Sequence, residues 1–286
     1  MVTMGIIGRG HESNILRMHI WNALKCVHTN LSCQKGERQG VSVHRFYVSP
    51  TQITKDTIRI GESERHYLLN VLRLKAGECV QVFDGEGNSY IAALCDTRAP
   101  ALYASILRHQ FHPPTPPYIT LFQGLPKFDK MDLIVQKTTE VGVDQIVPMN
   151  CQRSVPKRTE IAQKNRLARW QRIANEAAKQ CERTRFAKVQ NVQPMDECLT
   201  LMGTVDLSIL LWENEEKKGI KAVLRNHAQA KSIGLFVGPE GGFSEAEVER
   251  AIQSGCIPTT LGPTILRTET AAIVSVALVM YELGNA

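Results

Sequence analysis

Two patterns of apolar and polar positions follow one another along the chain from residue 44 onward. Up to about residue 110 the apolar residues form short runs separated by turn signals such as Asp84-Gly85 and Gly87-Asn88. Short runs bounded by such turns predict strands of a small β-barrel or sandwich. The predicted strands are HRFYVS (44–49), a Thr/Ile-rich stretch (52–60), ECVQVFDG (78–85), NSYIAALC (88–95) and LYASILRH (102–109), with one helix over 64–72.

After residue 118 the pattern changes to strands that alternate with helices. Near-continuous apolar strands in such an alternation indicate an α/β fold, with a parallel sheet covered by helices on both faces. An apolar stripe along 160–181 predicts a long amphipathic helix. The predicted strands are ITLFQG (119–124), QIVPM (145–149), LSILLWE (207–213), SIGLFVG (232–238) and PTTLG (258–262); the other helices cover 130–141, 220–228, a segment from 244, and one ending near 283.

The segment HPPTPP at 112–117 is rich in proline and predicts a stiff linker. We therefore expect a β-domain over 44–111 and an α/β domain over 118–286. Residues 1–43 fit neither pattern, and we expect a disordered tail or a translation start placed too early. A targeting peptide is the alternative, because Arg outnumbers the acidic residues there.

Composition narrows the class of protein. At 286 residues with 43% hydrophobic residues, the chain can bury a core in each of two domains. The net charge is +6, and residues 151–188 hold eleven Lys/Arg against three Asp/Glu, which fits either a solvated helix face or a patch that faces phosphates. The eight cysteines show no zinc spacing, so we expect no metal and a reducing, cytoplasmic setting without a disulfide framework. No apolar run is long enough to cross a bilayer.

The stretch SIGLFVGPEGGFSEAE (232–247) leaves a predicted buried strand through three glycines and one proline, and then begins a helix. Ser244 and Glu247 have the spacing of a capping box. Residues 238–243 are therefore predicted as a strand-to-helix loop at the carboxyl end of a strand, where open α/β sheets bind ligands. The loop lacks both common phosphate-binding glycine patterns. It is predicted to offer bare backbone groups to a flat heterocycle, unless it is a plain tight turn.

The stretch LGPTILRTET (261–270) repeats the Gly-Pro step and again opens a helix, for which Thr268 is the predicted N-cap. Arg267 stands directly before that helix, where the helix macrodipole favours negative charge. We interpret this arginine as aimed at a ligand or substrate. The alternative is a structural salt bridge to Glu269 or Glu240.

Together, GPEGGFS and the later LGPTILRTETA resemble the signature of the RsmE family, SPOUT-class RNA methyltransferases that act on N3 of a uridine in small-subunit (16S) ribosomal RNA. Three further segments resemble the family, and the resemblance covers residues 44 to 283. They are KFDKMDLIVQKTTEVGV (127–143), QRSV (152–155) and RWQRIANEAAKQCER (169–183).

The resemblance implies a PUA-like RNA-binding barrel followed by a SPOUT domain with a trefoil knot. It also implies S-adenosyl-L-methionine as cofactor, small-subunit ribosomal RNA or the assembled small subunit as partner, and a homodimer whose active site borrows from both subunits. By the same resemblance the cofactor-binding residues are Leu211, Trp212, Glu213, Val237, Gly238, Pro239, Glu240, Gly241, Gly242, Leu261, Gly262, Ile265, Leu266 and Thr270.

For catalysis we expect Arg267 and Glu269. A deprotonated uridine N3 spreads its charge onto the ring carbonyl oxygens, and Arg267 would stabilise that charge. The candidate general bases are Glu140, Glu240 and Glu269. RNA phosphates would be bound by Arg45, Arg73, Lys130, Arg153 and Arg183.

Two positions depart from the family pattern. Thr264 stands where the family usually has Arg, and Glu182 stands where it usually has a small residue. Three other functions stay open: a related SPOUT enzyme with another target atom, a non-catalytic rRNA-binding assembly factor, and a nucleotide hydrolase.

Overall fold

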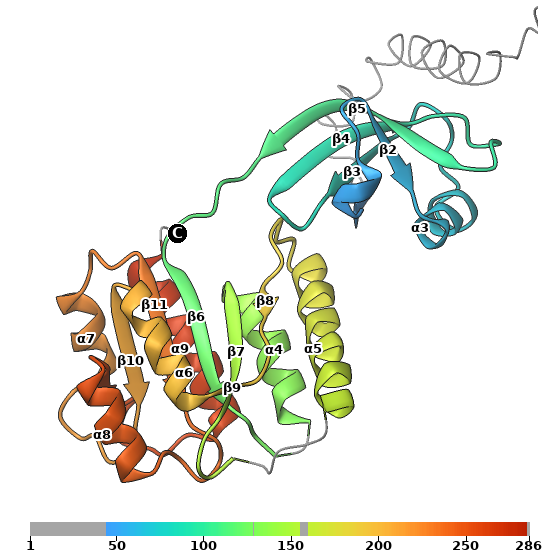
Figure 1. The fold of residues 1–286 in the computed structure, drawn as a ribbon. Coiled ribbons are helices and arrows are strands. Elements are labelled where there is room, and N and C mark those ends of the chain that lie inside the picture. The colour runs from blue at the N-terminus through green and yellow to red at the C-terminus, as the bar shows by residue number, and fades with distance from the viewer. Residues whose placement is uncertain (1–43, 128, 155–159, 285–286) are drawn as a thin grey trace, which may run out of the picture. The chain divides into compact units, whose positions relative to one another are not determined.

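The computed structural model describes residues 44–127, 129–154 and 160–284, so the expectations for residues 1–43 lie outside the described residues. The chain divides into two compact units, Met1–His112 (unit 1) and Pro113–Ala286 (unit 2). Figure 1 shows a strand-rich unit 1 and, in unit 2, a sheet with helices on both sides.

Unit 1 is built on a five-stranded sheet in the order β1-β3-β4-β5-β2. Strand β1 pairs parallel with β3, and the other pairs are antiparallel. Alternate residues of the strands are buried in one cluster that also holds Leu68. The elements are β1 (Arg45–Tyr47), β2 (Thr57–Ile60), α3 (Glu62–His66), β3 (Cys79–Phe83), β4 (Asn88–Leu94) and β5 (Leu102–Phe111).

The helix predicted over 64–72 is shorter and less regular than expected. Helix α3 is followed by a wide turn at Tyr67–Val71, and Arg73 then adopts a left-handed φ of 57°. His66, at the end of α3, is exposed. Cys79 is disulfide-bonded, whereas Cys95, Cys151, Cys181, Cys198 and Cys256 are free thiols.

Unit 2 is built on a seven-stranded parallel sheet in the order β12-β10-β11-β6-β7-β8, with β9 also pairing with β7. The strands are β6 (Tyr118–Gly124), β7 (Gln145–Asn150), β8 (Lys188–Val189), β9 (Gln193–Pro194), β10 (Leu207–Leu211), β11 (Ser232–Val237) and β12 (Ile257–Thr259). The helices are α4 (Lys130–Val141), α5 (Glu160–Gln180), α6 (Met195–Thr200), α7 (Ile220–Asn226), α8 (Glu245–Gln253) and α9 (Thr268–Leu283).

Each face of this sheet carries its own hydrophobic cluster, because successive residues of a strand point to opposite faces. Leu121 and Leu235 pack on one face with residues of α4, α5, α7 and α9. Phe122 and Phe236 pack on the other face with residues of α6 and α8, and their rings stack at 4.3 Å between centroids. The prediction of helices on both faces is confirmed, whereas the trefoil knot remains a prediction.

Candidate active site

The carboxyl ends of β10, β11 and β12 meet at one edge of the sheet, because neighbouring strands are parallel. The loops that follow these strands, together with the start of α9, line a cavity of about 1180 Å³. Gly241 and Gly262, which belong to the two separate Gly-Pro loops, both line it. The two loops therefore form a single site.

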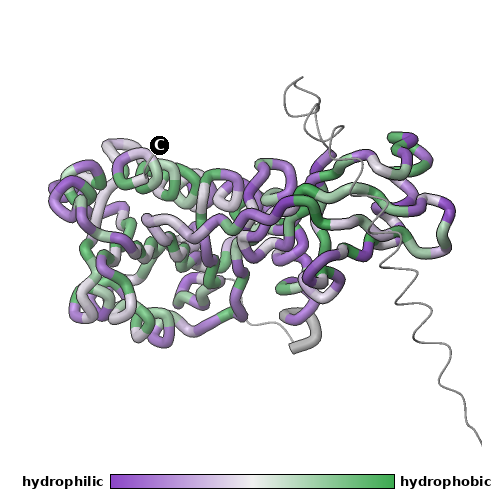
Figure 2. Tube along the Cα trace, turned by 90° about the horizontal axis from the view of Figure 1, so that it is seen from above, coloured by the Kyte–Doolittle hydropathy of each residue, from purple (hydrophilic) through white to green (hydrophobic). Residues whose placement is uncertain are grey.

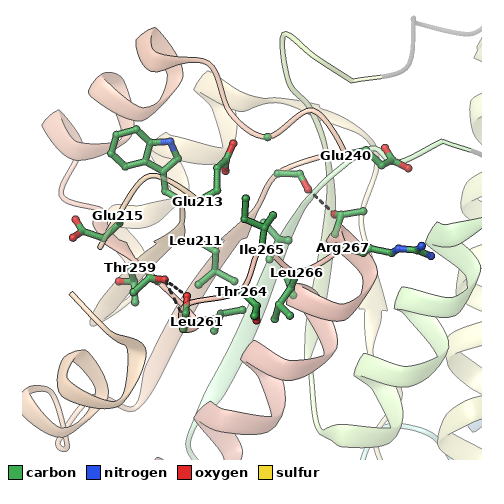
Figure 3. A pocket seen from close by; sticks show the side chains of 18 of the residues that line it. Leu211, Glu213, Glu215, Glu240, Thr259, Leu261, Thr264, Ile265, Leu266 and Arg267 are labelled. Atoms are coloured by element: carbon green, nitrogen blue, oxygen red, sulfur yellow. Dashed lines mark hydrogen bonds between the residues drawn. The ribbon is translucent and has the colours of Figure 1, made fainter. Parts of the chain in front are cut away.

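All of the expected cofactor residues except Thr270 line this cavity, and so do Arg267 and Lys130. Figure 3 shows Leu211, Ile265 and Leu266 within the cavity, with the Arg267 side chain extending away from them. Thr264 and Thr268, which the sequence indicated for other reasons, also line the cavity. Several further lining residues were not predicted, and adjacency to the two motifs was the only signal for them. They are Glu215, Glu216, Thr259, Thr260, Pro263 and Ala271.

The loop after β11 is a tight turn held close to the end of β6. The amide of Gly242 donates to the Pro239 carbonyl at 2.9 Å, and Gly242 has a φ of 65° that favours glycine. Gly124, the last residue of β6, lies so close that a Cβ there would be 2.6 Å from the Pro239 nitrogen. The absence of a side chain at Gly124 lets the loop approach the sheet.

The helix after this loop begins as predicted. Ser244 accepts a hydrogen bond from the Glu247 amide, and the Glu247 carboxylate accepts one from the Ser244 amide, which confirms the capping box. Glu247 also accepts from the amide of Gln152 at 2.7 Å. Arg153 donates to the carbonyl of Gly241 at 2.8 Å. The turn at residues 151–154 therefore holds residues 238–243, the glycine loop, in place through hydrogen bonds.

The start of α9 differs from the prediction. Arg267 occupies the N-cap position without a side-chain capping bond, and Thr268 is the first helical residue. The Thr268 hydroxyl donates to the Gly238 carbonyl at 2.6 Å and accepts from Gln123 Nε2 at 2.9 Å. The predicted N-cap role of Thr268 is wrong because its hydroxyl bonds the neighbouring loop instead of its own helix.

Lys130, at the start of α4, lies between two carboxylates. Its Nζ is 3.2 Å from Glu240 Oε1 and 3.3 Å from Glu269 Oε2. Desolvation opposes the charge of Lys130, but the two carboxylates outweigh it and raise the pKa of the ammonium. Burial raises the pKa of Glu240, but hydrogen bonds from its own amide and the Lys127 amide, with the Lys130 ammonium, lower that pKa overall.

These ion pairs bear on the two interpretations of Arg267. Both carboxylates proposed as its structural partners are paired with Lys130. Within the described part of the chain the exposed Arg267 guanidinium makes no hydrogen bond or ion pair. It is thus available to a ligand.

The three candidate general bases have different surroundings. Glu140 pairs with Lys137 at 2.9 Å and lines a groove between α4 and α5, outside the cavity described above. Glu240 lines the cavity, but its lowered pKa makes it a weak base. Glu269 does not line the cavity, and 14% of its side chain is exposed.

The residues expected to bind RNA phosphates are scattered over both units. In unit 1, the Arg45 guanidinium lies 3.9 Å from the centre of the Phe83 ring, and Arg73 is exposed. Lys130 lines the cavity, and Arg153 donates to the carbonyls of Gly241 and Phe243 in the loop after β11. Arg183 donates to the carbonyls of Thr139 at 2.9 Å and Val143 at 2.7 Å, around the carboxyl end of α4.

We expect Arg183→Met to lower the free energy of unfolding by about 1–3 kcal/mol, because charge-assisted hydrogen bonds to two carbonyls are lost. RNA affinity should change little, since this guanidinium is committed inside unit 2. Urea unfolding and RNA titration of the purified variant check both statements. A large loss of RNA affinity with unchanged stability would restore Arg183 to the RNA-binding set.

Two classes of feature are absent from the described residues. No group of three or more His, Cys, Asp or Glu side chains there could hold a metal ion. No helix in that part of the chain is both long and apolar enough to cross a membrane.

Known proteins resemble this chain in both sequence and fold. A family model described as an RNA methyltransferase domain matches residues 113–280, and one described as an RNA methyltransferase PUA domain matches residues 60–99. The ribosomal RNA small subunit methyltransferase E of Bacillus subtilis (strain 168) is 31% identical over 250 residues, which cover 84% of this chain and 97% of that protein. The chain belongs to the methyltransferase E (RsmE) family.

Other members of the RsmE family agree. The Synechocystis sp. (strain ATCC 27184 / PCC 6803 / Kazusa) protein is 32% identical over 246 residues, covering 85% of this chain and 79% of that protein. The crystal structure of the Neisseria gonorrhoeae protein bound to S-adenosyl methionine is 30% identical, with a TM-score of 0.71 over 84% of this chain and 98% of that one. The fold is therefore SPOUT-type, preceded by a PUA-like domain.

Proposed function

We propose that this RsmE family member transfers the methyl group of S-adenosyl-L-methionine to N3 of a uridine in small-subunit (16S) ribosomal RNA. The observation that carries the proposal is the single cavity formed by both Gly-Pro loops, lined also by Arg267, whose guanidinium has no partner among the described residues. A non-catalytic assembly factor would not need to keep that cationic side chain free beside such a cavity.

The cavity fits S-adenosylmethionine in shape and chemistry. Gly262 has a φ of 137°, and a Cβ built there would meet no atom within 4 Å, so any side chain would protrude into open space. Ile265 is apolar and 85% exposed, which leaves a surface for a flat adenine ring. The residues that would hold the cofactor are the backbone of 238–242 and 261–266, with Leu211, Leu261 and Leu266. When bound, it supplies an electrophilic methyl group on a sulfonium.

Arg267 is the residue we assign to catalysis. The imide N3 of uridine attacks well only after it loses its proton, and the negative charge then spreads onto two carbonyl oxygens. A preorganised guanidinium stabilises this charge, and the N-terminus of α9 adds positive partial charge at the same end of the helix. The loops that fix Arg267 contribute the rest by orienting the reacting groups.

Glu269 has a different part from the one expected. Because it pairs with Lys130 and does not line the cavity, we assign it to positioning and name no general base. Thr264 lines the cavity as a neutral side chain where the family usually has a cation. Arg267 therefore carries more of the anion stabilisation in this chain.

We also propose that the enzyme works as a homodimer on ribosomal RNA in the cytoplasm, with unit 1 contacting RNA through Arg45 and Arg73. Helix α9 is composed mostly of apolar residues, and green stretches lie beside the C-terminus in Figure 2, yet Tyr281 is 84% exposed. An apolar helix of this kind is normally covered, and a second copy would cover it.

The test is mass spectrometry of nucleosides from small-subunit RNA incubated with the protein and methyl-labelled S-adenosylmethionine. Naked RNA and assembled subunits are both used as substrates. We expect labelled 3-methyluridine. Label on a ribose or on guanine would favour a related SPOUT activity. Absence of label from both substrates, together with no cofactor binding in calorimetry, would favour the assembly factor.

A further inference from the structure

Two sets of contacts, called clamps below, connect the loop after β11 with the start of α9. The function proposed above uses only Glu269 from them. The first clamp is neutral and buried. The Thr268 hydroxyl, 6% exposed, donates to the Gly238 carbonyl at 2.6 Å and accepts from Gln123 Nε2 at 2.9 Å. Gln123 is fully buried at the end of β6 and also donates to the Gly124 carbonyl at 2.9 Å. This clamp therefore ties three chain segments together.

The second clamp is ionic and lies at the edge of the cavity. The Lys130 ammonium connects Glu240, two residues beyond Gly238, to Glu269, the residue after Thr268. Glu269 Oε2 is buried without a hydrogen bond, so its ion pair with Lys130 is the contact that compensates its charge among the described residues. Both clamps join the same two segments, 238–240 and 268–269.

Arg267 directly precedes the clamped residues of α9. Its backbone is fixed by Thr268 and Glu269, while its side chain keeps no partner within the described chain. Figure 3 shows the Glu240 and Arg267 side chains pointing in the same direction, Glu240 from the loop after β11 and Arg267 from the start of α9. Without Lys130, Glu269 would be an uncompensated carboxylate two residues from Arg267. Glu240 would then keep only the hydrogen bonds from its own amide and the Lys127 amide.

We propose that Thr268 and Lys130 are positioning residues: Thr268 fixes the two cofactor loops against each other, and Lys130 holds both carboxylates away from Arg267. For Lys130, this positioning role takes the place of the RNA-phosphate contact that the sequence suggested. The expected change in turnover rests on the methyl transfer proposed above. The expected change in cofactor affinity does not depend on which RNA atom is methylated.

The experiment measures S-adenosylmethionine affinity by calorimetry without RNA, the turnover number and the melting temperature for two pairs of variants. Thr268→Val should weaken cofactor binding about tenfold, the equivalent of one net hydrogen bond, and lower turnover on the order of 100-fold. Thr268→Ser keeps the hydroxyl and should behave like the wild type. If Thr268→Val does not fold, Gln123→Met provides a second test, because it removes the donor that bonds the Thr268 hydroxyl.

Lys130→Met should lower turnover on the order of 10- to 100-fold with RNA affinity unchanged, and Lys130→Arg should restore it. The double variant Lys130→Met/Glu240→Gln should recover part of the loss, because one of the two unpaired carboxylates is removed.

Matched controls are Ser275→Ala and Lys137→Met. Ser275 is a buried hydroxyl of α9 that bonds only within the helix, and Lys137 pairs with Glu140 on α4 outside the cavity. Neither control should change cofactor affinity or turnover.

Two results would overturn the proposal. One is a folded Thr268→Val variant with wild-type cofactor affinity and turnover. The other is a Lys130→Met variant whose only defect is weaker RNA binding with a salt dependence reduced by about one charge, the mark of a phosphate contact. A wild-type protein that binds the cofactor but methylates another atom would contradict the proposed function and leave the affinity comparison intact.

Discussion

Arg267→Ala is expected to lower the turnover number for methyl transfer about 100- to 1000-fold, the effect of removing one preorganised donor from a developing anion. The affinity for S-adenosylmethionine should stay near that of the wild type, because the substitution leaves all other residues that line the cavity in place. The melting temperature should also stay unchanged, since the exposed guanidinium makes no hydrogen bond or ion pair within the described residues.

The matched control is Arg225→Ala, which removes an exposed arginine of α7 that pairs with Glu282 at 2.7 Å outside the cavity. This control should keep full turnover. Single-turnover assays with saturating cofactor separate the chemical step from binding. If Arg267→Ala turns over at nearly the wild-type rate, Arg267 has no part in the reaction.

Gly124→Ala is expected to damage both stability and the site although it adds one methyl group. A Cβ at this position would lie 2.6 Å from the nitrogen and Cδ of Pro239 and 3.0 Å from the carbonyl carbon of Gly238, so the glycine loop would have to move. Overpacking of this kind costs about 1–3 kcal/mol of unfolding free energy. A displacement of about 1 Å in the loop costs on the order of 100-fold in turnover.

Gly203→Ala is the matched control, because a Cβ at that exposed glycine meets no atom within 4 Å. Its stability should be unchanged or slightly raised. Urea unfolding gives the stability of both variants, and calorimetry gives their affinity for S-adenosylmethionine. Wild-type cofactor affinity in Gly124→Ala would show that the loop tolerates the shift, and the close approach at β6 would then have no functional consequence.

Much of unit 2 was predictable because its elements depend on local signals. Helix α4 covers the predicted residues 130–141, and the capping box at Ser244 and Glu247 forms as its spacing indicated. Strands β6, β7 and β11 lie within one residue of their predicted ends. Two-residue strands β8 and β9 and helix α6 were missed, because such short elements form only through pairing with β7 and packing on the sheet.

The roles of the charged and polar residues were less predictable. Arg183 was expected at RNA, yet its donors bond carbonyls near the end of α4, about forty residues earlier in the chain. Lys130 was expected at RNA as well, yet it pairs with carboxylates from the loop after β11 and from the first turn of α9. Thr268 was predicted as an N-cap from its residue type, but its hydroxyl donates to the Gly238 carbonyl of another loop.

By itself the sequence determined the two-part organisation, the parallel α/β class and the two Gly-Pro motifs, because hydrophobic period, capping signals and glycine placement act over a few residues. Only the tertiary structure decided that both motifs share a cavity, that Lys130 engages Glu240 and Glu269, and that Arg267 is left unpaired among the described residues. The physical reason is that a charge selects its partner by distance in space, and the parallel strands bring together loops that lie far apart in the chain.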